Sequence, residues 1–318
     1  MNEPEFDVII VGGGAAGLNA ALVLARSRRR VAVIDAGEPR NRFTDHMHGF
    51  LSRDGFSPHE LLEIGRAEVL GYGATIVAGR AVSASGAIGG FSVEVESATS
   101  GAGDRRTLTA RRLVIATGLR DELPDIPGLA EQWGRGAVAC PYCDGWEARD
   151  SRVAVIATTT RNAHQAALMR QLTDDIALVG RSTAHLETET LRGFAARGVK
   201  VIENDVVRVS RVDANRERPL ALTLDDGRTL EADAVFTGGA MVANDDLLRQ
   251  LGAARETGPM GEWTASDPTG RTSVPGVWVA GNSANAGALV IVAAASGLTA
   301  ATVINAELVQ DDIARALP

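Results

Sequence analysis

One feature constrains this chain more than any other: a glycine-rich turn joins an apolar strand to a helix close to the N-terminus. The pattern predicts the strand over residues 7–11, the helix over residues 18–26, and a second apolar strand over residues 31–34 that ends at an aspartate. A strand, a G-x-G-x-x-G turn, a helix, a strand and an acid in this order are typical of a dinucleotide-binding unit.

Each residue type in that turn has a physical task. The first glycine permits the tight turn, the second lets the backbone approach a pyrophosphate, and the third lets helix and strand pack closely. The free N–H groups at the start of the helix then face the phosphates, and the acid accepts hydrogen bonds from a ribose. The alternative is a glycine-rich turn without a ligand, which the acid at the end of the second strand argues against. The candidate cofactor-binding residues are Gly12, Gly14, Ala15, Ala16, Gly17 and Asp35.

Further strands follow. Residues 91–96 and 112–115 predict two strands with a polar Gly/Ser/Thr-rich turn between them, and the second strand leads into Ala116-Thr117-Gly118. Residues 276–282 predict another strand that enters a glycine turn, followed by a helix that runs to about Leu308.

The strand–helix–strand pattern occurs a second time. Residues 153–156, 163–172 and 176–179 align without a gap with the N-terminal unit, so the chain is predicted to hold two Rossmann-like folds. The binding residues have changed, however, because a Cβ at each former glycine crowds the place where backbone meets pyrophosphate. Arg181 alone remains for a 2′-phosphate, and we interpret it as a surface charge. Gly12, Gly14, Gly17 and Asp35 correspond to Ala157, Thr159, Asn162 and Gly180.

The only two cysteines, Cys140 and Cys143, stand three residues apart. Two thiols are too few for a disulfide framework. A structural zinc site needs four ligands, and none of the five histidines stands at zinc-finger spacing from the pair. We therefore expect no metal and predict redox chemistry. The alternative is two buried, inert thiols.

Composition limits the class of protein. The chain has 318 residues, 45% of them hydrophobic and 23% charged, which is enough apolar material for two globular domains. The net charge is −8 and the arginines are scattered, so we expect no nucleic-acid binding. We see no signal peptide. Residues 286–304 lack charge, but their many small residues favour a buried helix over a membrane span. We expect a cytoplasmic protein that does not bind a membrane.

Four motifs give the whole chain a resemblance to the low-molecular-weight thioredoxin reductase family of flavoproteins. They are GGGAAG (12–17), ATG (116–118), CPYCDGWE (140–147) and GVWVAGN (276–282). The resemblance implies an α/β protein with two Rossmann-like domains of the FAD/NAD(P)-binding type, the second inserted into the first. Residues 1–120 and 246–318 would bind FAD, and residues 121–245 would carry the C-x-x-C pair facing the flavin. It also implies a homodimer, and FAD contacts from Ala116, Thr117, Gly118, Gly281 and Asn282.

Two departures refine the resemblance. Thioredoxin reductases keep a G-x-G-x-x-A loop and an H-R-R segment for NADPH, and both are missing here. In this respect the chain is similar to the natural-product dithiol oxidases that form the disulfides of holomycin, gliotoxin and romidepsin with FAD and oxygen and without NADPH. The other departure is Asn282, where the family usually has an aspartate that contacts the flavin ribityl chain; asparagine can still hydrogen-bond there.

The resemblance also implies a division of roles within the pair. Cys143 faces the flavin, and Cys140 is attacked by a substrate thiolate before the second substrate thiol resolves the mixed disulfide. The electrons pass through the flavin to oxygen, which gives hydrogen peroxide. A helix start at the pair lowers the thiol pKa. Asp144 matches the acid/base aspartate of the reductases, where many dithiol oxidases have histidine; its alternative is a turn or N-cap role.

Three functions remain open. The first is an FAD-dependent dithiol oxidase that acts on a small-molecule or short-peptide dithiol with molecular oxygen. The second is an NADPH-dependent reductase of thioredoxin or a similar protein, and the third is a non-catalytic flavin-binding redox sensor.

His46 and His48 lie either near a substrate channel or in a solvated loop, and we favour the loop. Trp146 is predicted to be a core or interface residue, and of the four tryptophans it is the one whose contact with the redox pair should be checked.

Overall fold

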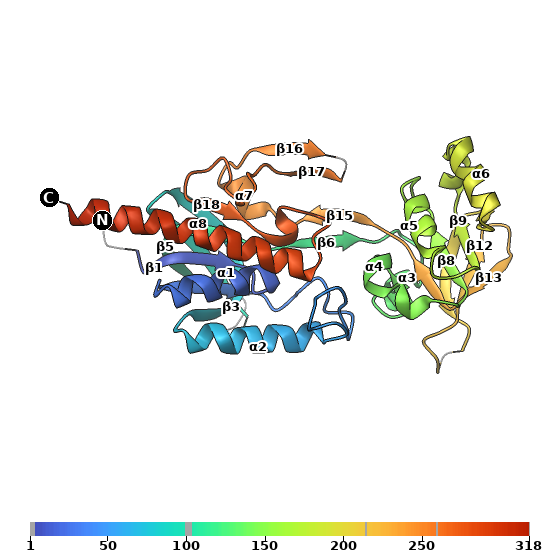
Figure 1. The fold of residues 1–318 in the computed structure, drawn as a ribbon, viewed down its shortest axis with the longest axis horizontal. Coiled ribbons are helices and arrows are strands. Elements are labelled where there is room, and N and C mark those ends of the chain that lie inside the picture. Colours follow the sequence, from blue (N-terminus) through green and yellow to red (C-terminus); the bar gives the residue numbers. More distant parts are fainter. Residues whose placement is uncertain (1–3, 99–103, 214, 259, 318) are drawn as a thin grey trace. The chain divides into compact units, whose positions relative to one another are not determined.

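The structure is a computed structural model that describes residues 4–98, 104–213, 215–258 and 260–317. The chain divides into two compact units, each made of discontinuous segments (Figure 1). Unit 1 comprises Met1–Asp45, Phe56–Arg120 and Met241–Pro318, and unit 2 comprises His46–Gly55 and Asp121–Ala240.

The division differs from the predicted domains in two places. The chain returns to unit 1 at Met241 rather than at residue 246, and His46–Gly55 belongs to unit 2 although we predicted it within residues 1–120. The physical reason is local, because His46 and His48 pair with carboxylates next to the cysteine pair in unit 2. That one domain binds FAD and the other has lost NADPH stays a prediction.

Unit 1 is built on a mainly parallel sheet whose central strands are buried on both faces. Such strands are continuous apolar runs rather than alternating ones, as Val8–Val11 illustrates, with at most 4% exposure. The parallel order is β3 (Thr75–Ala87), β2 (Val31–Asp35), β1 (Phe6–Val11), β5 (Arg105–Ile115) and β18 (Val277–Val279). The outer halves of β3 and β5 pair with antiparallel β4 (Gly90–Ser97) in the same sheet. The polar turn predicted between β4 and β5 falls largely on residues 99–103, outside the described residues.

Helices cover the sheet of unit 1. They are α1 (Ala15–Arg26), α2 (Pro58–Gly71), α7 (Asp246–Gln250) and α8 (Val290–Ala316). In Figure 1, α8 runs beside α1. The approach is close: a Cβ at Gly297 would lie 2.8 Å from the carbonyl carbon of Ala16. Helix α8 continues to Ala316, past the predicted end at Leu308, and its last turns pair with buried arginines of β5.

Helix α8 is the one helix in the described ranges that is long and apolar enough to cross a membrane, by length and composition alone. Its face bearing Ala300, Ala301, Ile304 and Leu308 is fully buried and packs with α1 in the core of unit 1.

Unit 2 repeats the parallel sheet. Its order is β10 (Lys200–Ile202), β9 (Ile176–Val179), β8 (Val153–Ile156), β14 (Ala234–Phe236) and β7 (Ala137–Val138). Helix α5 (Asn162–Met169) follows β8 as α1 follows β1, although it ends three residues before the predicted Leu172. The predicted fold class, two Rossmann-like α/β domains, is confirmed.

The remaining elements are short. Strands β6 (Leu119–Glu122) and β15 (Ala240–Ala243) pair with each other where the chain passes between the units. The others are α3 (Leu129–Gln132), α4 (Pro141–Asp144), η1 (Trp146–Ala148), η2 (Arg181–His185), α6 (Thr188–Ala196), β11 (Val206–Arg211), β12 (Leu220–Leu224), β13 (Thr229–Ala232), β16 (Arg255–Gly258), β17 (Gly261–Thr264) and η3 (Gly281–Ser283).

Candidate functional site

Three predicted cofactor turns of unit 1 meet at one edge of its sheet. Strands β1, β5 and β18 are parallel, and Ile115 is in register with both Val11 and Val279. The strands therefore end together. The N–H of Ala116 donates to Val11 O (2.7 Å), and that of Ala280 donates to Ile115 O (3.0 Å). The carboxyl edge of a parallel sheet is where such folds bind nucleotides.

The three turn glycines differ in what surrounds them. Gly12 has a φ of +112°, and a Cβ there would lie 2.6 Å from the carbonyl carbon of Ala116. A Cβ at Gly17 would lie 3.0 Å from the carbonyl carbon of Gly12. Among the described residues, a Cβ at Gly14 would meet no atom within 4 Å, and no side chain caps the start of α1. Glycine at 12 and 17 is thus required by contacts within the protein. Gly14 instead leaves open space beside the free N–H groups of the helix start, and this space fits a pyrophosphate.

Asp35 ends β2 beside this turn. Its side chain is 14% exposed and accepts hydrogen bonds from Arg66 Nη2 (2.9 Å) and from the Gly37 N–H (3.0 Å). A Cβ at Gly13 would lie 2.7 Å from Asp35 Cβ. Sequence reasoning missed both Arg66 and the need for glycine at 13. The three consecutive glycines were a signal for the second, and nothing in the sequence indicated the first.

Thr117 and Gly118 are fixed by residues that the sequence analysis did not identify. Thr117 Oγ1 donates to Asn244 O (2.5 Å), and Asn244 Nδ2 donates to Thr117 O (3.0 Å). The Gly118 N–H donates to Ser283 Oγ (2.6 Å), and Ser283 is fully buried. The two predicted turns, 116–118 and 281–282, are therefore tied to each other through Ser283.

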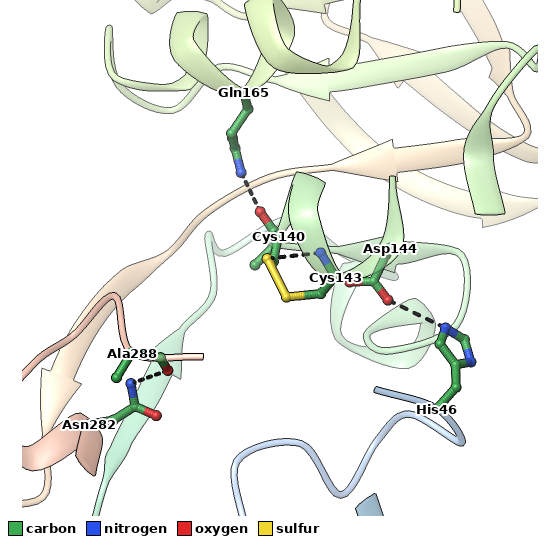
Figure 2. The surroundings of a disulfide bond; sticks show 8 residues. His46, Cys140, Cys143, Asp144, Gln165, Asn282 and Ala288 are labelled. Carbon is green, nitrogen blue, oxygen red and sulfur yellow. Dashed lines mark hydrogen bonds and ion pairs between the residues drawn. A yellow bond between two sulfur atoms is a disulfide. The ribbon is translucent and has the colours of Figure 1, made fainter. Parts of the chain in front are cut away.

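The side-chain amide of Asn282 forms hydrogen bonds within its own loop. Nδ2 donates to the carbonyl oxygens of Asn285 (3.0 Å), Ala286 (3.2 Å) and Ala288 (3.0 Å; Figure 2). An aspartate has no N–H to donate and would place a negative charge against three carbonyl oxygens. This loop geometry explains asparagine at 282. Its contact with a flavin ribityl chain stays a prediction.

The two cysteines of unit 2 form a disulfide, with 5.2 Å between their Cα atoms (Figure 2). Cys140 is the N-cap of the short helix α4, and Pro141 occupies the first helical position, where its missing N–H costs no hydrogen bond. The Cys143 N–H donates to Cys140 Sγ at 3.2 Å. This donor favours the thiolate of Cys140 once the bond opens. The alternative of two separate, inert thiols is wrong.

Asp144 is the last residue of α4. Its side chain is 20% exposed, and burial raises its pKa. His46, whose Nε2 lies 3.9 Å from Asp144 Oδ1 (Figure 2), opposes that rise, and Glu147 adds to it. The N-cap role considered for Asp144 is wrong, because Cys140 caps the helix. A partly buried carboxyl with a raised pKa, adjacent to Cys143, holds its proton to a higher pH than an exposed aspartate does.

His46 and His48 lie in a loop, as predicted, but the loop is only partly solvated. Their side chains are 38% and 21% exposed, and His48 Nε2 lies 3.3 Å from Glu147 Oε1. Trp146 is 63% exposed rather than a core residue. A pocket of about 450 Å³ is lined by His48, Gly49, Asp54, Tyr142, Cys143, Trp146 and Glu147.

The turn of the second nucleotide fold is closed by its own side chains. Asn162, at the position of Gly17, is 5% exposed, and its Oδ1 accepts the N–H of Thr159 at 3.0 Å. Asn162 Nδ2 donates to Gln165 Oε1 (2.7 Å), and Gln165 Nε2 donates to Ala139 O (2.7 Å), next to the disulfide. A backbone donor that would face a pyrophosphate is thus occupied.

Arg181, the predicted surface charge, is engaged by two carboxylates. Its Nε lies 3.1 Å from Asp205 Oδ2, and its Nη2 lies 2.5 Å from Asp225 Oδ2. A 2′-phosphate at Arg181 would meet both negative charges.

Comparison with known proteins places the chain among disulfide oxidoreductases. A family model described as pyridine nucleotide-disulphide oxidoreductase matches residues 6–297. A protein named thioredoxin reductase tcpT, from Claviceps purpurea, is 30% identical over 291 residues, covering 87% of this chain and 86% of the relative. The crystal structure of HlmI is 44% identical with a TM-score of 0.87, covering 98% of this chain and 95% of the other. An oxidoreductase structure from Agrobacterium tumefaciens is 34% identical with a TM-score of 0.87, covering 96% and 98%.

Proposed function

The chain belongs to the pyridine nucleotide-disulphide oxidoreductase family, as a thioredoxin reductase-like flavin enzyme, and from that premise we propose that it is an FAD-dependent dithiol oxidase. Its substrate would be a small-molecule or short-peptide dithiol, its electron acceptor molecular oxygen, and its products a disulfide and hydrogen peroxide. We also propose that it works as a cytoplasmic homodimer without a nucleic-acid or membrane partner.

One observation carries the choice of oxidase over reductase: the second nucleotide turn is filled. Asn162 accepts the Thr159 N–H, and Asp205 and Asp225 hold Arg181. A phosphate of NADPH would have to compete with Asn162 for the Thr159 N–H and with two carboxylates for Arg181, which disfavours its binding. The first turn keeps the open space at Gly14 and the uncapped helix start. One nucleotide, FAD, is therefore expected.

The electrons then come from the substrate. A substrate thiolate attacks Cys140 Sγ, the Cys140–Cys143 bond breaks, and Cys143 leaves as a thiolate. The second substrate thiolate attacks the substrate sulfur of the mixed disulfide and releases Cys140 as a thiolate, so two electrons have moved from substrate to enzyme. FAD, when bound, would accept these two electrons from the enzyme dithiol and pass them to oxygen.

Asp144 handles a proton in this sequence. It follows Cys143 directly, and burial raises its pKa, so its carboxyl is protonated over a wider pH range than an exposed aspartate. It is the group placed to protonate the leaving thiolate of Cys143 and to take the proton back when the disulfide closes. Meanwhile, the backbone N–H of Cys143 stabilises the Cys140 thiolate.

Anaerobic titration of the purified holoprotein tests the proposal. Dithiothreitol in stoichiometric amounts should bleach the flavin absorbance, and NADPH or NADH should leave it unchanged. Admission of air should restore the colour and produce one hydrogen peroxide per dithiol oxidised. Bleaching by NADPH at a rate comparable to the dithiol would establish a reductase instead. Absence of bleaching by either donor would leave the redox sensor and overturn the oxidase.

The reductase is the second candidate, and Asp144 is the observation that favours it. Reductases of the resembling family have aspartate at this position, and a curated relative is named as a thioredoxin reductase. The same titration separates the two functions, because a reductase must accept electrons from a nicotinamide nucleotide.

A further inference from the structure

Two histidines and a glutamate converge beside the disulfide without a role in the proposed chemistry. His46 and His48 flank Met47, which is 5% exposed, so the two rings project from the opposite side of an extended segment. Their ring centroids are 5.1 Å apart. Glu147 approaches from η1. One possible ligand atom from each of the three side chains lies within 4.8 Å of the other two.

Part of this arrangement already has the spacing of a metal site. Two ligands on a tetrahedral zinc, each 2.0–2.2 Å from the metal, lie about 3.3 Å from each other. His48 Nε2 and Glu147 Oε1 are 3.3 Å apart. The other carboxylate oxygen, Glu147 Oε2, is buried and has no hydrogen-bond partner within the described ranges.

His48 also has the outer partner that metal-binding histidines usually have. Its Nδ1 lies 3.2 Å from Asp54 Oδ2, and the Gly49 N–H holds Asp54 Oδ1 at 2.9 Å. A carboxylate on Nδ1 fixes the tautomer that leaves Nε2 free to ligate, and Nε2 is the atom that faces Glu147.

The surroundings leave a further ligand position available. The pocket that His48, Asp54 and Glu147 line is also lined by Cys143. Three protein ligands and an open position are typical of a zinc site that accepts water or another ligand. Imidazole nitrogens favour zinc and related transition metals, whereas Mg²⁺ and Ca²⁺ prefer oxygen ligands.

We propose that His46, His48 and Glu147 form a binding site for a divalent transition metal, with zinc the best match, and that Asp54 is its positioning residue. This goes beyond the oxidase function and departs from the absence of metal expected from cysteine and histidine spacing. A metal held here lies in the pocket that Cys143 lines, so its occupancy would interfere with thiol chemistry.

Equilibrium dialysis of the untagged, disulfide-form holoprotein against ZnCl₂, with metal counted by mass spectrometry, tests the site. Wild type should bind one zinc per chain, and an excess of MgCl₂ should not displace it. His48→Ala and Glu147→Gln should each weaken zinc binding at least about 10-fold, and Asp54→Asn about 10-fold or more through loss of the outer partner. His59→Ala is the matched control, because His59 is exposed, pairs only at the surface with Glu63, and lies outside the cluster.

The outcomes are distinguishable. Retained flavin colour and an unchanged melting temperature show that a variant is folded. If His48→Ala unfolds, Glu147→Gln still tests the site, because glutamine keeps the shape of the glutamate side chain. Failure of wild type to bind zinc, or equal binding by wild type and Glu147→Gln, overturns the proposal. Equal weakening by His59→Ala overturns it as well, because the zinc would then be held by surface histidines. None of these readouts depends on oxidase turnover.

Discussion

Alanine at Gly12 should destabilise the fold, whereas alanine at Gly14 should leave the fold nearly unchanged and weaken FAD binding. The two glycines belong to the same turn, but the structure gives them different surroundings. Gly12 has a positive φ and is closely packed against Ala116, whereas Gly14 has a φ of −81° and faces open space. A single methyl group therefore tests the fold at one position and the ligand at the other.

The magnitudes follow from this geometry. Gly12→Ala forces a side chain into a backbone conformation that costs about 1–3 kcal/mol. It also adds a methyl group 2.6 Å from the Ala116 carbonyl carbon, and overpacking of this kind costs about 1–3 kcal/mol. The sum, about 2–6 kcal/mol, is a large part of the 5–15 kcal/mol that typically stabilises a domain. Gly14→Ala changes only the N-cap residue, which costs at most about 1 kcal/mol.

The assay has two arms. Urea unfolding of the apoproteins, followed by tryptophan fluorescence, should show Gly12→Ala strongly destabilised and Gly14→Ala close to wild type. Titration of folded Gly14→Ala with FAD should then show at least a 10-fold loss of affinity, about 1.4 kcal/mol, because the methyl group occupies the place of a phosphate. Gly71→Ala, at an exposed glycine with no atom near its Cβ position, is the control and should change neither property. Wild-type FAD affinity in Gly14→Ala would refute the assignment of the turn.

Three further predictions concern the redox pair, Asp144 next to it, and the buried carboxylate Asp7 of unit 1. Cys140→Ser and Cys143→Ser should each abolish oxygen consumption with dithiothreitol while FAD stays bound; a variant that keeps more than about a tenth of the wild-type rate would remove that cysteine from the mechanism. Asp144→Asn should slow the reaction about 100-fold or more. Because the pKa of Asp144 is raised in the folded state, wild type loses stability as pH rises from below 3.8 through that pKa. Asp144→Asn should therefore have a higher melting temperature than wild type at pH 7 and the same melting temperature at pH 3. Burial would raise the pKa of Asp7, but hydrogen bonds from Arg30 and Arg111 outweigh it and lower that pKa. Asp7→Asn should therefore lower the free energy of unfolding by about 3 kcal/mol at pH 7. This difference from wild type should fade in acid, where wild-type Asp7 becomes protonated.

The sequence was sufficient for features that depend on local patterns. The apolar runs of β1, β2, β8 and β9 begin and end within a residue of their predicted bounds, because strands buried on both faces need continuous apolar side chains. The gapless alignment of the two units also predicted the second Rossmann-like fold. Helix ends were less well predicted: α8 runs eight residues past Leu308, since its last turns are held by Arg111 and Arg112, charged residues whose burial no periodicity indicates.

The features that the sequence did not reveal depend on segments distant in the chain. His46 and Glu147 are about a hundred residues apart in sequence, and only the folding of His46–Gly55 onto unit 2 brings them together. Arg66 reaches Asp35 from α2, and Ser283 links two turns from η3. Spacing rules of the zinc-finger kind cannot detect such sites, because they describe ligands that are neighbours in the sequence.

The two nucleotide-type folds differ in how the backbone N–H groups at their first turn are used. In unit 1, glycine at position 17 lets the turn and helix pack directly, and the helix start keeps its N–H groups free for a ligand. In unit 2, Asn162 occupies the equivalent position, and its side-chain oxygen takes the N–H of Thr159 as a phosphate oxygen would. The same side chain passes a hydrogen bond through Gln165 to Ala139, immediately before Cys140. The side chain that fills this turn thus also supports the loop that carries the redox pair, and this structural role holds whichever donor supplies the electrons.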